Sequence, residues 1–487
     1  MVGLAGDAYR FGKWPEESVE KGTAGRGRNL RVEQSAWHWV SSSRSSCEFR
    51  FMKKYPIDIW LTDPLANFLG RQTTSGIVLF VAALVALVLA NSPFADAYHH
   101  LWHNEFSIGF KGFLIRKTLH HWINDGLMGV FFFVIGLELK REIMAGELSD
   151  PRDALLPIAA GIGGMVVPAL IYLAFNHSGE ATDGWGIPMA TDIAFALGII
   201  SLLGDRVPLS LKVFLTALAI ADDIGAVLVI AFFYTSHIDF LNLAGGAVFM
   251  ILLVTSNMMG IRNILWYGLL GIGGLWLAFL LSGVHATIAA VLAAFTIPAN
   301  VKISDKGFIM RIKGLVSKFE AANINNDVTL VTDEQLHLLE DIRTVAKEAL
   351  TPLQRLEHAM HPFVAFVVMP VFALANAGIS FPTDFLGQLA SPVTLGVAFG
   401  LLGGKVLGIM GMCYILIRFQ WASFPEQTGW KHLFGAAMLA SVGFTMSLFI
   451  TGLAFSDGTL VLQAKLGILM ASLAGGSAGY YLLKQAR

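Results

Sequence analysis

Residues 185–231 read WGIPMATDIAFALGIISLLGDRVPLSLKVFLTALAIADDIGAVLVIA. The pattern predicts two apolar helices joined by a short polar loop at residues 204–206. Three carboxylates lie inside the apolar runs, Asp192 in the first run and Asp222 and Asp223 in the second. A carboxylate at the centre of a membrane helix costs about 2.5–3.5 kcal/mol, so three cost on the order of 8–10 kcal/mol unless they are compensated. A chain that keeps three carboxylates at this depth is expected to use them.

Two kinds of ligand suit a carboxylate in a dry, polar cavity: a proton, or a hard cation that prefers oxygen. Because one carboxylate cannot easily bind both at once, this competition is a simple chemical basis for exchanging protons against metal cations. Asp222 and Asp223 point about 100° apart on a helix, and they titrate as a coupled pair. The structural alternative for Asp192, which follows Thr191, is a helix N-cap. A purely structural Asp222–Asp223 pair is disfavoured because the like charges repel.

The composition is that of a polytopic membrane protein. Of 487 residues, 55% are hydrophobic and 14% are charged, whereas soluble domains carry roughly 25% charged residues. The net charge of −1 provides no basic field, so a nucleic-acid partner is not expected. The two cysteines, Cys47 in a polar segment and Cys413 in an apolar one, do not make a disulfide framework.

We predict an all-α polytopic membrane protein with about twelve transmembrane helices. Each apolar stretch is about long enough to cross ~30 Å of hydrocarbon, and the boundary between 263 and 298 is the least well defined. The expected spans are residues 74–91, 122–139, 154–175, 185–203, 208–233, 239–256, 263–282, 283–298, 358–378, 392–417, 432–455 and 460–483.

Positively charged residues predict the orientation, because loops rich in Lys and Arg stay on the cytoplasmic side. The loops near 176–184, 235–238, 380–390 and 456–459 have no Lys or Arg, so they are expected outside. Both termini are therefore expected in the cytoplasm. The cytoplasmic loops and the C-terminal tail hold Lys140, Arg141, Arg152, Arg206, Lys212, Arg262, Arg418, Lys431, Lys484 and Arg487.

The first outside loop, residues 92–118, is an exception because it holds three basic residues. Its sequence FSIGFKGFLI at 106–115 alternates and turns at Lys111-Gly112, which predicts a β-hairpin. In a cytoplasmic loop later in the chain, EQLHLLEDIRTVAKEAL at 334–350 has helical apolar spacing and predicts a surface helix.

The chain divides into four segments by composition. The first is rich in Ser, Arg and Gly and is expected to be disordered, with Met52 as an alternative start of the protein. The segments are a polar extension at 1–60, eight membrane helices at 61–298, a long cytoplasmic loop at 299–354 and four membrane helices at 355–487.

Lys405 lies deep inside the apolar run LLGGKVLGIM at 401–410. A lysine at this depth needs a counter-ion or a lowered pKa, and the available anions are Asp192, Asp222 and Asp223. The alternative is that the side chain reaches up to the membrane surface.

Two spans carry signals of an interrupted helix. Gly186 and Pro188 precede Asp192 in one span, and Gly443 lies within SVGFTMS at 441–447 in the other. An interrupted helix presents free N–H and C=O groups at the middle of the membrane, and one such helix in each half of the chain indicates a transporter with inverted repeats. Ordinary glycine-mediated helix packing is the alternative.

Two polar motifs are expected at the same cytoplasmic mouth. GLELKRE at 136–142 ends the second span, and RLEHAMH at 355–361 begins the ninth. Because His changes charge near neutral pH, carboxylates and histidines gathered there make a plausible proton sensor. The alternative is two ordinary solvated helix ends.

Several separate motifs from about Gly76 to the C-terminus resemble those of the NhaA-type bacterial Na+/H+ antiporter family. The resemblance implies inverted repeats and two discontinuous helices that cross near the membrane midplane. It implies a transporter of the bacterial inner membrane, not an enzyme, that exports sodium or lithium in exchange for protons, is electrogenic and pH-regulated, and has no cofactor. The motifs are WINDGLMGVFFFVIGLELKRE, ATDIAFALG, GDRVPLSLKVFLTALAIADDIGA, SGVHAT, RLEH, FALANAGIS, GKVLGI and GFTMSLFI.

The resemblance also implies roles for single residues. Asp222 and Asp223 would bind the sodium ion and carry protons, and Thr191 would help to ligate the ion. Asp192 would balance the helix ends that face it, and Lys405 would pair with Asp222. The cytoplasmic pH-response cluster would be Glu138, Arg141, Glu142, Glu357 and His358.

The hairpin at 106–115 looks like the family's homodimer contact. The extension at 1–60 and the loop at 299–354 lie outside the common core of the family. Val406 stands where a proline is usual, so the helix near Lys405 is expected to be straighter.

Two other functions use similar residues. A sodium-coupled symporter for an organic solute would need more polar surface in the membrane than these spans offer. An intramembrane aspartyl protease needs two facing carboxylates that share one water, whereas Asp222 and Asp223 diverge and the usual Gly-x-Gly-Asp element is missing.

Overall fold

The computed structural model of the chain describes residues 72–110, 113–235, 238–322, 331–382 and 384–486. The polar extension with Met52 and the expected turn at Lys111-Gly112 lie outside the described residues.

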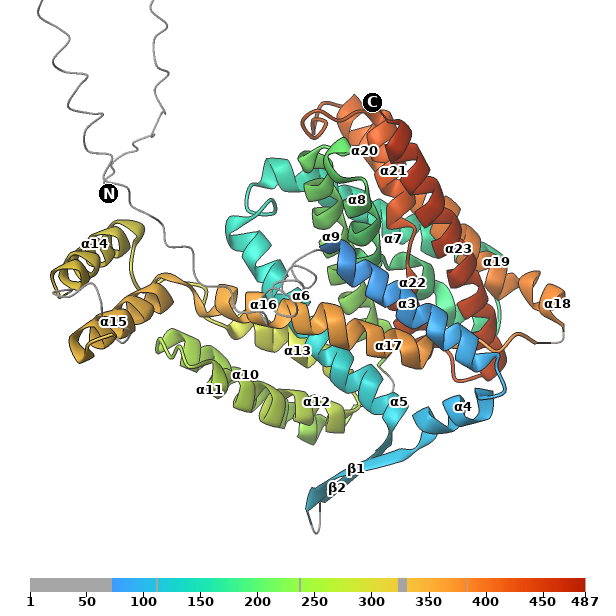
Figure 1. Cartoon of the computed structure of the whole chain (residues 1–487). Coiled ribbons are helices and arrows are strands. Elements are labelled where there is room, and N and C mark those ends of the chain that lie inside the picture. The colour runs from blue at the N-terminus through green and yellow to red at the C-terminus, as the bar shows by residue number, and fades with distance from the viewer. Residues whose placement is uncertain (1–71, 111–112, 236–237, 323–330, 383, 487) are drawn as a thin grey trace, which may run out of the picture. The chain divides into compact units, whose positions relative to one another are not determined.

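Long apolar helices dominate the described part of the chain (Figure 1). Within that part, nine helices are long and apolar enough to cross a membrane, so the chain is a polytopic membrane protein. They are α5 to α6 (Leu119–Ala145), α7 (Pro151–Phe175), η3 with α8 (Glu180–Leu202), α9 (Leu209–Phe233), α10 (Phe240–Met258), α11 to α12 (Ile264–Ser282), α16 to α17 (Pro352–Asn376), α19 to α20 (Pro392–Arg418) and α23 (Gly458–Gln485).

Two further apolar segments are bent pairs of helices. α3 (Gln72–Ala90) and α4 (Ala95–His103) meet at 113°, so α4 turns away from the direction of α3. α21 (Trp430–Ala440) and α22 (Phe444–Ala454) meet at only 43°, with a break at Ser441–Gly443. The second pair can therefore continue in one general direction across the membrane.

The expected span at 283–298 is not confirmed as a full membrane crossing. Its helix, α13 (Ala286–Thr296), has 11 residues, which cover only about 17 Å at 1.5 Å per residue. Gly283 explains where the preceding helix ends, because its φ of +82° is a left-handed conformation that glycine adopts without strain.

Four of the described spans contain a π-helical turn, and one of these turns lies next to Lys405. α19 (Pro392–Phe399) continues into the π-helical turn η7 (Gly400–Gly404) and then into α20 (Lys405–Arg418). The span is continuous through Val406, and the π-helical turn immediately precedes Lys405.

α7 packs closely against α9 and α20 because glycines line its contact faces. A Cβ atom on Gly163 would lie 2.4 Å from the carbonyl oxygen of Gly408 in α20. A Cβ atom on Gly161 would lie 3.3 Å from Oδ1 of Asp222 in α9. No side chain fits between the backbones of α7 and α20, so this contact fixes the distance between α20 and its neighbours.

The expected β-hairpin is confirmed. β1 (Glu105–Phe110) pairs antiparallel with β2 (Phe113–Thr118), and the pairing runs from Glu105 opposite Thr118 to Phe110 opposite Phe113. In Figure 1 the two strands project away from the helices.

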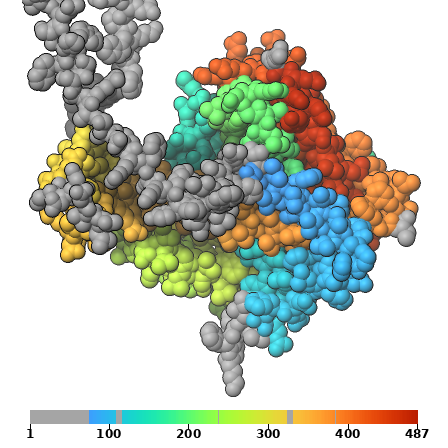
Figure 2. Space-filling view, in the orientation of Figure 1, coloured from blue at the N-terminus to red at the C-terminus, as the bar shows by residue number. Residues whose placement is uncertain are grey.

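The segment expected to be a mostly solvated loop with one helix contains two. The expected helix is confirmed as α15 (Asp333–Ala349), with a capping box between Thr332 and Gln335. A helix that was not expected, α14 (Asp305–Ala321), packs against it, and the two lie together in yellow in Figure 2. Lys302 forms an ion pair with Glu348 at their base, and this hydrogen bond holds the pKa of the Glu348 carboxyl below its usual range.

Candidate functional site

Two spans lose their regular helical structure at the same place. In one, the 3-10 helix η3 (Glu180–Met189) gives way to non-helical residues before α8 (Ile193–Leu202) begins. In the other, the break between α21 and α22 lies at Ser441–Gly443. Hydrogen bonds join the two breaks directly: Asp192 N to Val442 O (2.7 Å), Thr191 Oγ1 to Ala440 O (2.9 Å) and Ser447 Oγ to Ile187 O (2.8 Å).

The Asp192 carboxylate connects the first turns of two helices. Its Oδ1 accepts from the backbone N–H of Phe195 at 3.0 Å, which caps α8. Its Oδ2 accepts from both the backbone N–H (3.0 Å) and the hydroxyl (2.5 Å) of Thr445 in the first turn of α22. Because a helix N-terminus carries partial positive charge, two of them compensate the charge of this fully buried carboxylate. Asp192 is therefore an N-cap and also a link between the two interrupted spans.

Asp222 is paired with a lysine. The Lys405 ammonium donates hydrogen bonds to Asp222 Oδ2 and to Thr191 Oγ1, and the Thr191 hydroxyl lies 2.7 Å from the same Oδ2. All three side chains are fully buried, so Lys405 does not reach up to the membrane surface. Of the three anions available in the sequence, Asp222 is the one that balances this lysine.

Asp223 has no such partner. Among the described residues, neither of its carboxylate oxygens has a hydrogen-bond partner, and the same holds for Oδ1 of Asp222. Asp223 is also fully buried. Leaving three carboxylate oxygens unsatisfied in a buried site is costly unless a proton or a cation binds them. The site thus offers hard oxygen ligands beside a fixed positive charge.

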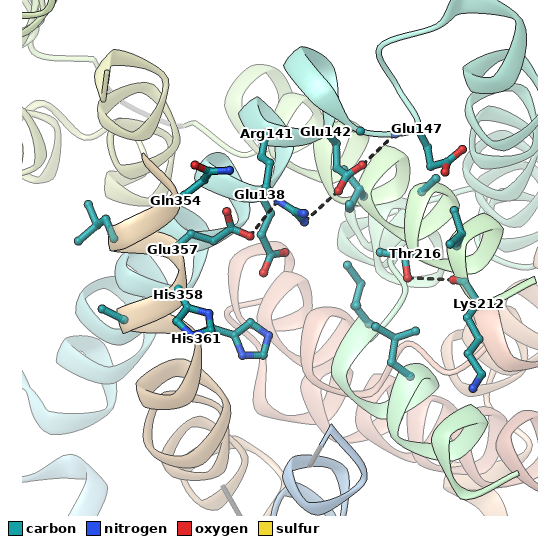
Figure 3. A pocket seen from close by; sticks show the side chains of 18 of the residues that line it. Glu138, Arg141, Glu142, Glu147, Lys212, Thr216, Gln354, Glu357, His358 and His361 are labelled. Carbon is teal, nitrogen blue, oxygen red and sulfur yellow. Dashed lines mark hydrogen bonds and ion pairs between the residues drawn. The ribbon is translucent and has the colours of Figure 1, made fainter. Parts of the chain in front are cut away.

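A cavity of about 1280 Å³ leads toward this site. Ile193, the residue after Asp192, lines it, and so does Ile220, which lies about one helical turn before Asp223. Figure 3 shows polar side chains from two sides around this cavity. The cavity therefore approaches the level of the buried carboxylates.

The five residues of the expected pH-response cluster line this one cavity. Arg141 in α6 (Met128–Ala145) bridges two carboxylates, Glu357 in α16 (Pro352–Phe363) at 3.0 Å and Glu142 at 2.9 Å. Glu138 and His358 lie next to this bridge (Figure 3). The structure brings together motifs that are more than 200 residues apart in the sequence.

Sequence reasoning did not include several polar residues of the site. Lys212 and Thr216 on α9 form the opposite wall of the cavity, together with Glu147 (Figure 3). Their spacing of four residues was a usable signal, because it places two polar side chains on one face of an apolar helix. Thr445, which donates two hydrogen bonds to Asp192, gave a weaker signal. A single threonine is common in membrane helices.

Sequence comparison places the chain among known proteins. A model of the family described as Na+/H+ antiporter 1 matches residues 66–483. The chain is 49% identical to the Na(+)/H(+) antiporter NhaA of Oleidesulfovibrio alaskensis over 429 residues, which cover 88% of this chain and 95% of that protein. It is 50% identical to the Na(+)/H(+) antiporter NhaA 1 of Saccharophagus degradans over 423 residues, covering 86% and 91% of the two chains. The NhaA antiporter of Acidithiobacillus ferrooxidans is 48% identical over 432 residues, covering 87% and 98%. The chain therefore belongs to the Na+/H+ antiporter 1 family.

Proposed function

We propose that the chain is a Na+/H+ antiporter that exports sodium or lithium from the cytoplasm in exchange for entering protons. The observation that carries this proposal is the set of three unpartnered carboxylate oxygens on Asp222 and Asp223, next to Lys405 and below a large cavity. These oxygens suit both a proton and a hard cation. The names of the relatives, which are Na+/H+ antiporters, support the same conclusion.

The mechanism follows from competition at one site. Sodium from the cavity binds to Asp223, to Oδ1 of Asp222 and to the Thr191 hydroxyl. On the outer side, protons neutralise the two carboxylates and displace the ion. When the site returns to the cytoplasmic side, those protons leave and the anionic site forms again. While both carboxylates are ionised, Lys405 balances Asp222, so that one net negative charge meets each sodium ion.

We further propose that two protons enter for each sodium ion. One net charge then crosses the membrane in each cycle, which is worth about 2.3 kcal/mol per 100 mV. The membrane potential would therefore help to drive sodium out of the cell.

The finer architecture also belongs to this proposal. We infer about twelve membrane segments, if each bent pair and the short α13 count as one, with inverted repeats and two discontinuous helices that cross at Asp192. We place the protein in the bacterial inner membrane with both termini in the cytoplasm, as the distribution of Lys and Arg favours. The hairpin at 106–115 serves as the homodimer contact, since it projects from the helices (Figure 1).

The experiment that tests the function uses the purified protein in liposomes that contain a pH-sensitive dye. With an acidic interior, added sodium or lithium is expected to raise the interior pH, while potassium and choline are not. A transient current recorded after a sodium pulse tests whether the exchange is electrogenic. An organic solute taken up with sodium, without proton movement, would instead identify a symporter.

Glu357→Gln is expected to shift the pH dependence of transport while leaving the maximal rate close to that of the wild type. Removing one negative charge from the Arg141 cluster makes the cavity more positive, so its remaining groups release their protons at lower pH. The activating pH should therefore fall by about half a unit or more. The measurement is the rate of sodium-dependent proton exchange against pH on both faces. Glu340→Gln, an exposed acid outside the cavity, is the control, and equal profiles for wild type and Glu357→Gln would remove this residue from the pH response.

A further inference from the structure

The C-terminal end of α13 is a junction with other helices. Its last carbonyl groups accept hydrogen bonds one after another: Phe295 O from Lys140 of α6 at 2.7 Å, Thr296 O from Asn257 of α10 at 2.6 Å, and Ile297 O from Lys140 again at 2.5 Å. The last carbonyl groups of a helix have no partner within that helix. These bonds from neighbouring helices therefore fix the position of the end of α13. Nothing in the exchange mechanism above uses these residues.

The next carbonyl group connects this junction to α16. Pro298 O accepts a hydrogen bond from the backbone N–H of Leu353 at 3.2 Å, and Leu353 lies in the first turn of α16. In the sequence, α14 and α15 lie between these two residues. Glu357 follows Leu353 by four residues, so it lies about one helical turn further along the same side of α16. The junction is therefore one turn away from a carboxylate of the cavity.

These hydrogen bonds and one ion pair form a closed ring. Arg141 follows Lys140 in α6, and its guanidinium forms an ion pair with Glu357 at 3.0 Å (Figure 3). From Glu357 the ring continues along α16 to the end of α13, and from there back to Lys140. A movement of α6 relative to α16 must stretch at least one of these bonds. The distance between Arg141 and Glu357 is therefore linked to the hydrogen bonds of Lys140.

Lys140 differs from its neighbour Arg141 in what it contacts. Among the described residues it has no ion-pair partner, and both of its hydrogen bonds go to backbone carbonyls of one helix end. The C-terminus of a helix carries partial negative charge, which favours an ammonium there. Lys140 is not one of the described residues that line the cavity, whereas Arg141 is. Lys140 can therefore affect the cavity through the helices that it joins.

We propose that Lys140 is a positioning residue for the pH response, because it joins α6 to the end of α13 and so keeps Arg141 within ion-pair distance of Glu357. This inference rests on the proposed antiport function. Without Lys140, α6 can move away from α16, and the Glu357 carboxylate loses part of its attraction to the guanidinium. It then binds a proton more readily and releases it at higher pH. The other charged and titratable groups around this cavity are Glu138, Glu142, Glu147, Lys212, Arg355, His358 and His361.

The test compares Lys140→Met with Lys140→Arg in liposomes, with the rate of sodium-dependent proton exchange measured against pH. Lys140→Met should raise the activating pH by about half a unit or more. Lys140→Arg should keep the wild-type profile, because a guanidinium can also donate to two carbonyl groups. Lys306→Met, which removes the same charge from an exposed residue of α14, is the matched control. Misfolding lowers the rate at every pH and does not move the midpoint of the profile.

A double variant separates positioning from a direct effect of the lost charge. In Glu357→Gln the carboxylate that Lys140 positions is missing, so adding Lys140→Met should not shift the profile further. A further shift overturns the proposal, because the ammonium then acts directly on the other groups of the cavity. Equal profiles for wild type and Lys140→Met also overturn it, while the antiport function stands. A wild-type protein without any sodium-dependent proton movement would instead overturn the antiport function itself.

Discussion

Asp223→Asn is expected to reduce sodium-dependent proton exchange about 100-fold or more, because the loss of one unit charge next to a bound cation costs several kcal/mol at an effective dielectric constant of about 20. Asparagine keeps the size of the side chain, but it carries no negative charge and takes up no proton. Both halves of the exchange therefore fail together. The measurement is the dye-based proton exchange assay with saturating sodium, combined with direct measurement of sodium binding by calorimetry.

The same substitution should not destabilise the protein. Asp223 is fully buried, and in the described part of the chain both its oxygens are without hydrogen-bond partners, so removing its charge removes a desolvation cost. We expect an equal or higher melting temperature. Asp205→Asn, at an exposed residue of the loop before α9, is the matched control for transport. Exchange at the wild-type rate in Asp223→Asn would show that the cation binds elsewhere.

Lys405→Met is expected to lower the free energy of unfolding by about 3–5 kcal/mol, which is the usual cost of leaving one member of a buried ion pair without its partner. Asp222 is fully buried, and in this variant its Oδ2 would retain only the Thr191 hydroxyl. Methionine fills a volume similar to that of lysine. The loss of unfolding free energy therefore measures the effect of the missing charge and not that of a cavity. The effect is measured by thermal melting in detergent, with the amount of monodisperse protein at each temperature as the readout.

The double variant Lys405→Met/Asp222→Asn separates this explanation from simple misfolding. Replacing the Asp222 carboxylate, which has lost its lysine partner, should restore most of the lost stability, because neither buried charge remains. Lys431→Met, at an exposed lysine at the start of α21, should change little. If the double variant is as unstable as the single one, Lys405 stabilises the protein through packing and not through Asp222.

Much of the site could be predicted because charged residues in apolar helices are rare and expensive. Asp192, Asp222, Asp223 and Lys405 stand out by composition alone, and each is fully buried in the structure. The aspartate that pairs with Lys405 was harder to predict from the sequence. From the residues themselves, any of the three aspartates could have paired with Lys405, and only the close approach of α7, α9 and α20 brings Asp222 to it.

The errors in the fold have physical causes. The end of α12 at Gly283 depends on a backbone conformation that hydropathy does not reveal, so the sequence did not show that α13 has only 11 residues. α14 was missed because its many lysines and arginines lower its mean hydropathy, although Phe308, Ile312, Leu315 and Phe319 follow a helical spacing. The contact of Thr445 with Asp192 joins residues 253 positions apart, which no local pattern encodes.

The glycine contact between α7 and α9 has a consequence for ionic radius. The space beside Asp222 Oδ1 is bounded by Gly161, whose missing methyl group would stand 3.3 Å from that oxygen. Main-chain atoms form this boundary, and they cannot swing aside as a side chain rotates. At the proposed site, we expect discrimination between lithium and sodium to depend on the spacing of α7 and α9. A distant substitution that moves α7 by a fraction of an ångström would then change this discrimination without altering a ligand.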